Sequence, residues 1–179
     1  TLGVSDFGVY NVVGGVVAMF AILSNSLSKA ISRYLTFELG KGNRERLLQI
    51  FGTSVNIQVI MAIIICLIGE LGGLWFINCK MNIDPSRIFA ANWVLHFSLF
   101  NFAINLISVP YNAAVVAHEK MGAFAYISIL EAGLRLLSIF LLGAVGFDKL
   151  IGWAVIQSIT ALIIIAVYAN YCSRHFEEV

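Results

Sequence analysis

The chain has 179 residues, of which 60% are hydrophobic and only 12% are charged, and its formal net charge is +1. Soluble domains are about 45–50% apolar and about 25% charged, so this composition excludes an ordinary soluble domain and indicates a polytopic membrane protein. The sequence has no basic patch or motif typical of nucleic-acid binding. The three cysteines fit no metal-ligand spacing, so neither a metal nor a cofactor is predicted.

Five segments are long and apolar enough to span a membrane, because a hydrocarbon core of about 30 Å requires about 20 helical residues. They cover residues 7–39, 47–77, 88–116, 121–145 and 150–172. Residues 40–43 have the composition of a helix end, and Pro110 predicts a break or kink in the third segment. The connections are short, at residues 40–46, 78–87, 117–120 and 146–149. Consecutive helices should therefore be antiparallel neighbours in an all-α membrane bundle.

The basic residues of the connections predict the orientation of this bundle. One side carries Lys41, Arg44, Arg46, Lys120 and Arg174, and the other carries Lys80, Arg87 and Lys149. Cytoplasmic loops are enriched in Lys and Arg, so the connection at 40–46 and the C-terminus are predicted to be cytoplasmic. Thr1 would then lie outside, and the sequence does not begin with Met. We therefore expect the chain to be part of a longer protein with at least one preceding helix.

The C-terminal third of the first segment has a polar face. Its residues follow helical spacing, at offsets 0, 3, 4, 7, 8 and 11: Asn25, Ser28, Lys29, Ser32, Arg33 and Thr36. They could form a cationic wall of a cavity, in which Arg33 offers two parallel hydrogen bonds to a phosphate and Lys29 a point charge. Alternatively, Lys29 and Arg33 could extend to the cytoplasmic lipid headgroups.

The third segment has an uncharged polar stripe on one helical face, composed of Ser98, Asn101, Asn105, Ser108 and Asn112. Polar groups are costly in hydrocarbon, so this face should contact protein or a water-filled cavity. Asn101, Asn105 and Asn112 are candidates to bind sugar hydroxyls, and hydrogen bonds between helices are the alternative.

The fourth segment places two opposite charges within the membrane. Glu131 and Arg135 are spaced i, i+4 and can pair. Arg135 could bind an anionic headgroup or Glu131 could exchange a proton, whereas a purely structural ion pair is the alternative. His96 is interpreted as a structural residue, and Glu70 as an acid at the outer interface. Nothing in the sequence indicates an enzyme, because no nucleophile motif or phosphate-binding glycine loop is present.

Three stretches resemble the polysaccharide-export flippases of the multidrug/oligosaccharidyl-lipid/polysaccharide exporter superfamily. Residues 2–15, LGVSDFGVYNVVGG, resemble the junction of the family's first two helices. Residues 32–42, SRYLTFELGKG, resemble the end of helix two, and residues 109–121, VPYNAAVVAHEKM, resemble the end of helix four and the loop that follows it. The resemblance covers nearly the whole chain, which would correspond to helices two to six of a family protein that has 12 or 14 transmembrane helices.

This resemblance implies one lobe of a two-lobed helical transporter, without its first helix and its second lobe. The implied substrate is an undecaprenyl-pyrophosphate-linked oligosaccharide, moved across the bacterial inner membrane for O-antigen or capsule synthesis. The other expected partners are membrane lipid and a coupling ion, H⁺ or Na⁺. A multidrug or cation antiporter of the same superfamily and a non-transporting membrane scaffold are the alternatives. The proposed cavity residues are Asn25, Lys29, Arg33, Asn101, Asn105, Asn112, Glu131 and Arg135.

Overall fold

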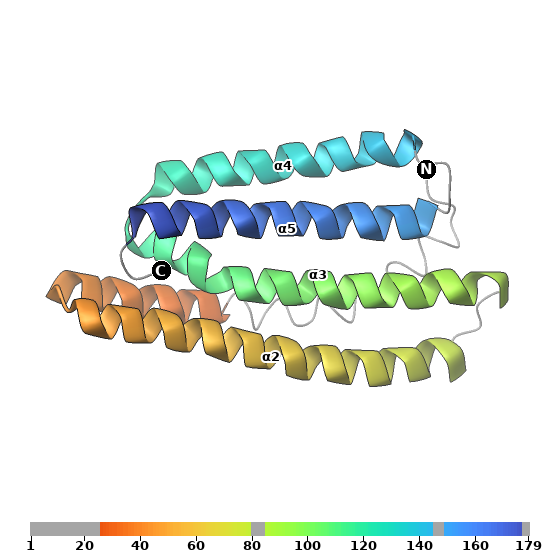
Figure 1. The fold of residues 1–179 in the computed structure, drawn as a ribbon, viewed down its shortest axis with the longest axis horizontal. Coiled ribbons are helices and arrows are strands. Elements are labelled where there is room, and N and C mark those ends of the chain that lie inside the picture. Colours follow the sequence, from red (N-terminus) through yellow and green to blue (C-terminus); the bar gives the residue numbers. More distant parts are fainter. Residues whose placement is uncertain (1–25, 80–84, 145–148, 177–179) are drawn as a thin grey trace.

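The computed structural model describes residues 26–79, 85–144 and 149–176, which form long antiparallel helices with short turns between them (Figure 1). A helix over residues 26–41 precedes four longer helices. These are α2 (Arg44–Cys79), α3 (Pro85–Ala117), α4 (Met121–Ala144) and α5 (Lys149–His175). No strand occurs in the described ranges, so the predicted all-α fold is confirmed.

Helix α3 is the central element of the bundle. It packs against both α2 and α5, whereas α4 packs mainly on α5, and Figure 1 shows these four helices in the order α4, α5, α3, α2. In its most apolar stretch, 50% of the residues of α3 are buried, compared with 17% in α2 and in α4. The polar stripe of the third predicted segment therefore belongs to the helix with the most neighbours.

The turn between the first helix and α2 has only two residues, Gly42 and Asn43, and not the seven predicted at 40–46. The amide of Gly42 donates to the Leu39 carbonyl at 3.1 Å, and the amide of Asn43 donates to the Glu38 carbonyl at 3.3 Å. This pair of bonds is a Schellman motif, and Gly42 supplies the left-handed residue that it requires, with φ of 68°. The Asn43 side chain then accepts a hydrogen bond from the Arg46 amide at 3.2 Å and caps the start of α2.

A break or a kink was predicted at Pro110, and the break does not occur, since α3 is one continuous helix from Pro85 to Ala117. Proline removes one backbone hydrogen bond from a helix interior and clashes with the preceding turn, which bends a helix without ending it when neighbours hold both sides. In Figure 1 the C-terminal end of α3 leaves the line of the longer part of the helix. The neighbouring Val109, Ala113 and Ala114 are buried, so the bend lies in a well-packed region.

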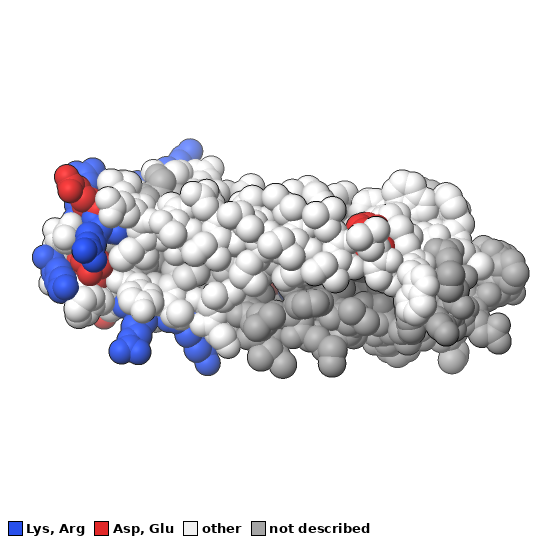
Figure 2. Space-filling view, turned by 90° about the horizontal axis from the view of Figure 1, so that it is seen from below, with Lys and Arg blue, Asp and Glu red and all other residues white. Residues whose placement is uncertain are grey.

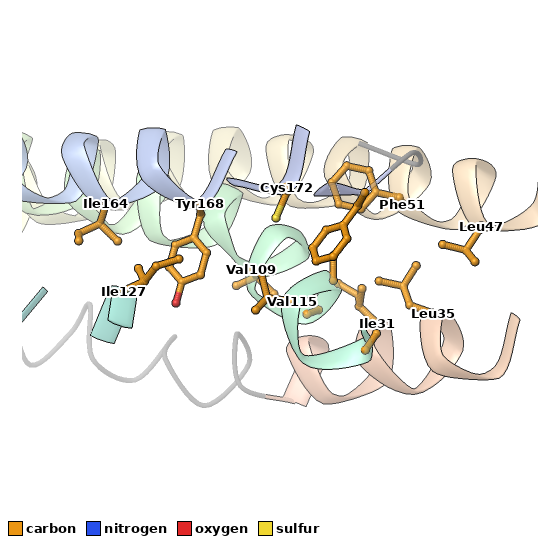
Figure 3. Close-up of a cluster of buried hydrophobic side chains, with 14 residues drawn as sticks. Ile31, Leu35, Leu47, Phe51, Val109, Val115, Ile127, Ile164, Tyr168 and Cys172 are labelled. Carbon is orange, nitrogen blue, oxygen red and sulfur yellow. The ribbon is translucent and has the colours of Figure 1, made fainter. Parts of the chain in front are cut away.

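The largest core cluster lies at the end of the bundle where the first helix joins α2 (Figure 3). Ile31 and Leu35 of the first helix contribute to it together with Phe51 of α2, whose ring meets the edge of Tyr111 at 5.4 Å between centroids. Val115 of α3 belongs to the same cluster. The first helix is therefore fixed to the bundle through its apolar face, which leaves its polar face directed elsewhere.

Four described helices are long and apolar enough to cross a membrane: Arg44–Trp75, Ile88–Ala117, Met121–Leu142 and Ile151–His175. The exposed faces of α2 and α4 carry large apolar side chains such as Leu71 (76% exposed) and Phe140 (79% exposed), as expected of surfaces that contact lipid. On the face seen in Figure 2, the Lys and Arg side chains gather at one end of the molecule. Of the first predicted span, 7–39, only the part from residue 26 lies within the described residues.

Candidate functional site

A groove of about 640 Å³ lies between the first helix and α3, near the end where basic side chains gather. The first helix contributes five polar residues and one aromatic residue, and α3 contributes two small apolar residues. The lining residues are Ser28, Lys29, Ser32, Arg33, Thr36, Phe37, Ala113 and Val116. The groove thus brings Lys29 and Arg33 together, as the helical spacing predicted.

The local sequence explains why these side chains face the groove. Ile31 and Leu35 are buried in the core cluster, and residues three or four positions apart share one face of a helix. Lys29 and Arg33 are four positions apart on the opposite face, and both are exposed. Because the apolar side of this helix is buried in the core cluster, Lys29 and Arg33 lie on the other side of the helix, where they line the groove.

Neither Lys29 nor Arg33 has a carboxylate partner among the described residues, so both charges are available to an anion. The Thr36 hydroxyl donates to the Ser32 carbonyl at 2.8 Å, so its proton is already used within the helix. A third cation lies close by, because the Lys41 ammonium sits 4.1 Å from the centre of the Phe37 ring. It also lies 3.8 Å from the Glu38 carboxylate, which partly neutralises it.

The opposite wall of the groove is apolar. Ala113 is fully buried and Val116 is half-buried, and both belong to α3 where it packs against the rest of the bundle. With Phe37 they form a hydrophobic surface beside two unpaired cations. This arrangement suits an amphipathic anion, whose charged group contacts Arg33 and Lys29 while a hydrocarbon part contacts the apolar wall.

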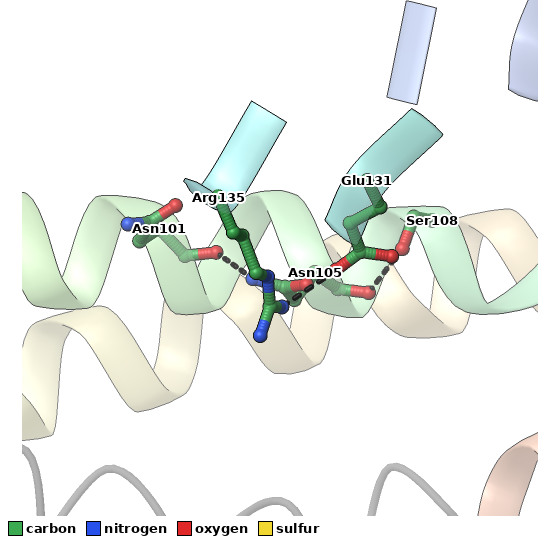
Figure 4. A network of polar contacts seen from close by, with 5 residues as sticks. All are labelled: Asn101, Asn105, Ser108, Glu131 and Arg135. Carbon is green, nitrogen blue, oxygen red and sulfur yellow. Dashed lines mark hydrogen bonds and ion pairs between the residues drawn. The ribbon is translucent and has the colours of Figure 1, made fainter. Parts of the chain in front are cut away.

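The stripe on α3 does not line this groove. The Asn105 side-chain amide donates to the Asn101 carbonyl at 2.8 Å, and the Ser108 hydroxyl donates to the Asn105 carbonyl at 2.7 Å (Figure 4). Such bonds satisfy polar side chains within their own helix, and they do not use the Asn105 side-chain oxygen, which can accept a hydrogen bond. Asn112 is half-buried one turn before Val116, so the stripe continues along α3 toward the groove.

The ion pair expected on α4 forms, and it lies outside the groove. The Arg135 guanidinium donates to the Glu131 carboxylate at 2.6 Å (Figure 4). Their side chains are 63% and 34% exposed. Arg135 is therefore largely neutralised by its neighbour, unlike Lys29 and Arg33. Asn25, the remaining candidate cavity residue, lies outside the described residues.

A contact between Glu70 and His96 was missed by the sequence analysis, which had given the two residues separate roles. His96 Nδ1 lies 2.7 Å from Glu70 Oε1, so the contact joins α3 to α2. One sequence signal could have found it. Glu70 lies 12 residues before and His96 lies 14 residues after residue 82, the centre of the connection between the two helices. In an antiparallel helix pair, residues at similar distances from the connection lie at similar heights.

The chain is similar to a protein named "Uncharacterized membrane protein EpsK" from Bacillus subtilis (strain 168), with 21% identity over 172 residues. The similarity covers 96% of this chain and 34% of that protein, so the chain spans about a third of its relative's length. No family model and no solved structure matches the chain. The four apolar helices and this relative together show a multi-pass membrane protein.

Proposed function

We propose that this chain forms part of a flippase for a lipid-linked oligosaccharide in the bacterial inner membrane. The cargo is a sugar chain on undecaprenyl pyrophosphate, which the protein moves from the cytoplasmic to the periplasmic leaflet. The observation that carries this proposal is the groove in which two cations without a carboxylate partner among the described residues face an apolar wall. A polyprenyl pyrophosphate combines the two chemical properties that such a groove accommodates, a multiply charged phosphate group and a hydrocarbon chain.

The charges of the groove favour this cargo over the cation that an antiporter of the same superfamily would carry. Its described lining includes Lys29 and Arg33 and no acidic residue. A cationic drug would meet like charges there, which costs free energy on binding. Away from the helix ends, the described acids are Glu70 and Glu131, and each contacts a basic side chain of the protein.

The position of the groove supports entry of the cargo from the cytoplasmic side. The basic residues Arg46, Lys120 and Arg174 belong to the same end of the bundle, which we assign to the cytoplasm by the enrichment of Lys and Arg in cytoplasmic loops. The C-terminus is then cytoplasmic as well. The uncharged stripe of α3 runs from the region of the groove toward the other end of the helix, and we propose that Asn105 and Asn101 bind sugar hydroxyls along the route.

Export of surface polysaccharide by a flippase-deficient strain tests this function. The full-length protein with Lys29→Gln and Arg33→Gln should restore polymer export to no more than about a tenth of the level given by the unaltered protein. The reason is that a hydrogen bond to a charged group contributes about 1.5–3 kcal/mol. The matched control is Lys120→Gln with Arg174→Gln, which removes two charges from the same end and should leave export unchanged.

Membrane levels of both double variants must be measured by immunoblot, so that loss of protein is separated from loss of transport. Full export by the Lys29 and Arg33 double variant at normal membrane levels would remove these residues from the site and would contradict the proposed role of the groove. Equal losses in the two double variants would show a general effect of charge on insertion, which also contradicts the proposal.

A further inference from the structure

The contact between Glu70 and His96 differs in kind from the ion pair on α4. Glu131 and Arg135 belong to one helix, whereas the contact between Glu70 and His96 joins two helices and includes an imidazole, a group that can gain or lose a proton. The side chain of His96 is 44% exposed and that of Glu70 is 33% exposed, so the pair lies at the edge of the α2–α3 interface and is accessible from one side.

Within the part of the chain that the structure describes, the helices around this pair carry few charged residues. On α2 the nearest titratable group is the Cys66 thiol, which donates to the Leu99 carbonyl at 3.6 Å, and no charged residue lies between Arg46 and Glu70. On α3 the Trp93 ring meets His96 at 6.2 Å between centroids, and the only charged residue is Arg87, more than two turns away. On α5, which packs on α3, charged side chains occur only near the two ends: Lys149, Arg174 and His175.

We propose that Glu70 and His96 form a proton-binding site. The Glu70 carboxylate accepts a hydrogen bond at 2.7 Å from His96 Nδ1, which fixes the hydrogen of neutral imidazole on Nδ1. Nε2 then carries the free lone pair and is the atom that takes up a proton from water. No other bond changes in this step, because the Nδ1–H to Oε1 hydrogen bond is present before and after it.

Proton binding changes the net charge at the α2–α3 interface from −1 to zero. Without the proton, the site is a carboxylate bonded to neutral imidazole, and with it the site is an imidazolium–carboxylate pair. A net charge is far more costly against hydrocarbon than a matched pair, so the two forms favour different surroundings. A coupling of this change to cargo movement rests on the proposed transport function, whereas proton binding itself does not depend on the cargo.

The test is nitrogen-15 NMR of histidine side chains in the full-length protein, labelled at histidine and held in lipid nanodiscs between pH 5 and pH 8. The His96 signals are assigned by their loss in His96→Gln. The expected result is that Nδ1 is protonated throughout, while Nε2 changes from unprotonated to protonated as the pH falls. A spectrum in which Nε2 never binds a proton, or in which Nδ1 is the nitrogen that titrates, would overturn the proposal.

A second variant tests the role of the carboxylate. In Glu70→Gln the amide can donate or accept a hydrogen bond, so neutral His96 should become a mixture of both tautomers. Glu131→Gln, which removes the other described intramembrane acid, should leave the His96 spectrum unchanged. A single Nδ1–H tautomer in Glu70→Gln would show that another group fixes the ring, which contradicts the proposed pair. None of these readouts requires transport, so they remain decisive if the flippase function fails its own test.

Discussion

Gly42 and Glu119 occupy equivalent positions at two helix ends. Each is the left-handed residue of a Schellman motif, with φ of 68° for Gly42 and 55° for Glu119. The Glu119 amide donates to the Val116 carbonyl at 3.0 Å, as the Gly42 amide donates to the Leu39 carbonyl at 3.1 Å. Glycine has no Cβ and adopts this conformation without strain, whereas for Glu119 it costs about 1–2 kcal/mol.

Glu119→Gly should therefore raise the thermal stability of the protein. Relief of the left-handed strain is expected to contribute about 1 kcal/mol, which corresponds to a few degrees in the midpoint of thermal unfolding. Gly42→Ala should lower the midpoint by a similar amount, because it places a Cβ in the same conformation. Unfolding in detergent, followed by tryptophan fluorescence, measures both shifts, and a lower midpoint for Glu119→Gly would contradict the assignment of strain.

Gly69 should be sensitive to substitution because it lies where α2 and α3 approach closely. A Cβ at Gly69 would lie 2.5 Å from Leu99 Cδ2, whereas a Cβ at Gly72 would meet nothing within 4 Å. Gly69→Ile should therefore overpack the interface and destabilise the fold by about 1–3 kcal/mol. Gly72→Ile, on the open face of the same helix, is the control. Equal unfolding midpoints for the two variants would argue against close packing at Gly69.

Gln58 is fully buried in α2, and neither Nε2 nor Oε1 of its side chain has a hydrogen-bond partner within the described part of the chain. A buried polar group without a partner costs about 1–3 kcal/mol. Gln58→Leu, which keeps a similar volume, should thus raise the unfolding midpoint. The control is Gln49→Leu at an exposed position of the same helix, which should change the midpoint little. A marked loss of stability in Gln58→Leu would show that the amide binds a partner such as water.

The α3 stripe should be accessible to water if it borders a transport route. In a background without native cysteines, Asn105→Cys should react with a membrane-impermeant, charged thiol reagent, because a thiolate forms only where water solvates it. Phe140→Cys, on the exposed apolar face of α4, should be protected by lipid. Mass spectrometry of the labelled protein gives the extent of reaction at each site. Protection of Asn105→Cys to the same degree would favour a dry contact between helices.

Much of the architecture was predictable because membrane spans are long and uniformly apolar. The sequence placed helices at 47–77 and 88–116, and the structure has them at Arg44–Cys79 and Pro85–Ala117. The Glu131–Arg135 pair was also predictable, since i, i+4 spacing within one helix brings the two side chains together. At Pro110 a break or a kink was predicted; the break does not occur, because tertiary packing holds one continuous helix on both sides of the proline.

The site was less predictable because its parts come from separate helices. Spacing alone aligned Lys29 with Arg33, but the groove also requires Ala113 and Val116, whose small side chains give no sequence signal of their own. Helical spacing also suggested that Asn105 faces a cavity. In the structure its side-chain amide donates a hydrogen bond to the Asn101 carbonyl of the same helix. Sequence periodicity identifies a polar face and does not identify what that face binds.

The most direct test of the account is binding of a polyprenyl pyrophosphate to the groove. Native mass spectrometry of the full-length protein can compare undecaprenyl pyrophosphate with undecaprenol, which has the same hydrocarbon chain and no charge. The pyrophosphate is expected to bind at least about tenfold more tightly than the alcohol, and Lys29→Gln with Arg33→Gln is expected to abolish this preference. Equal binding of the two lipids, or an undiminished preference in the double variant, would contradict the assignment of the groove as the headgroup site.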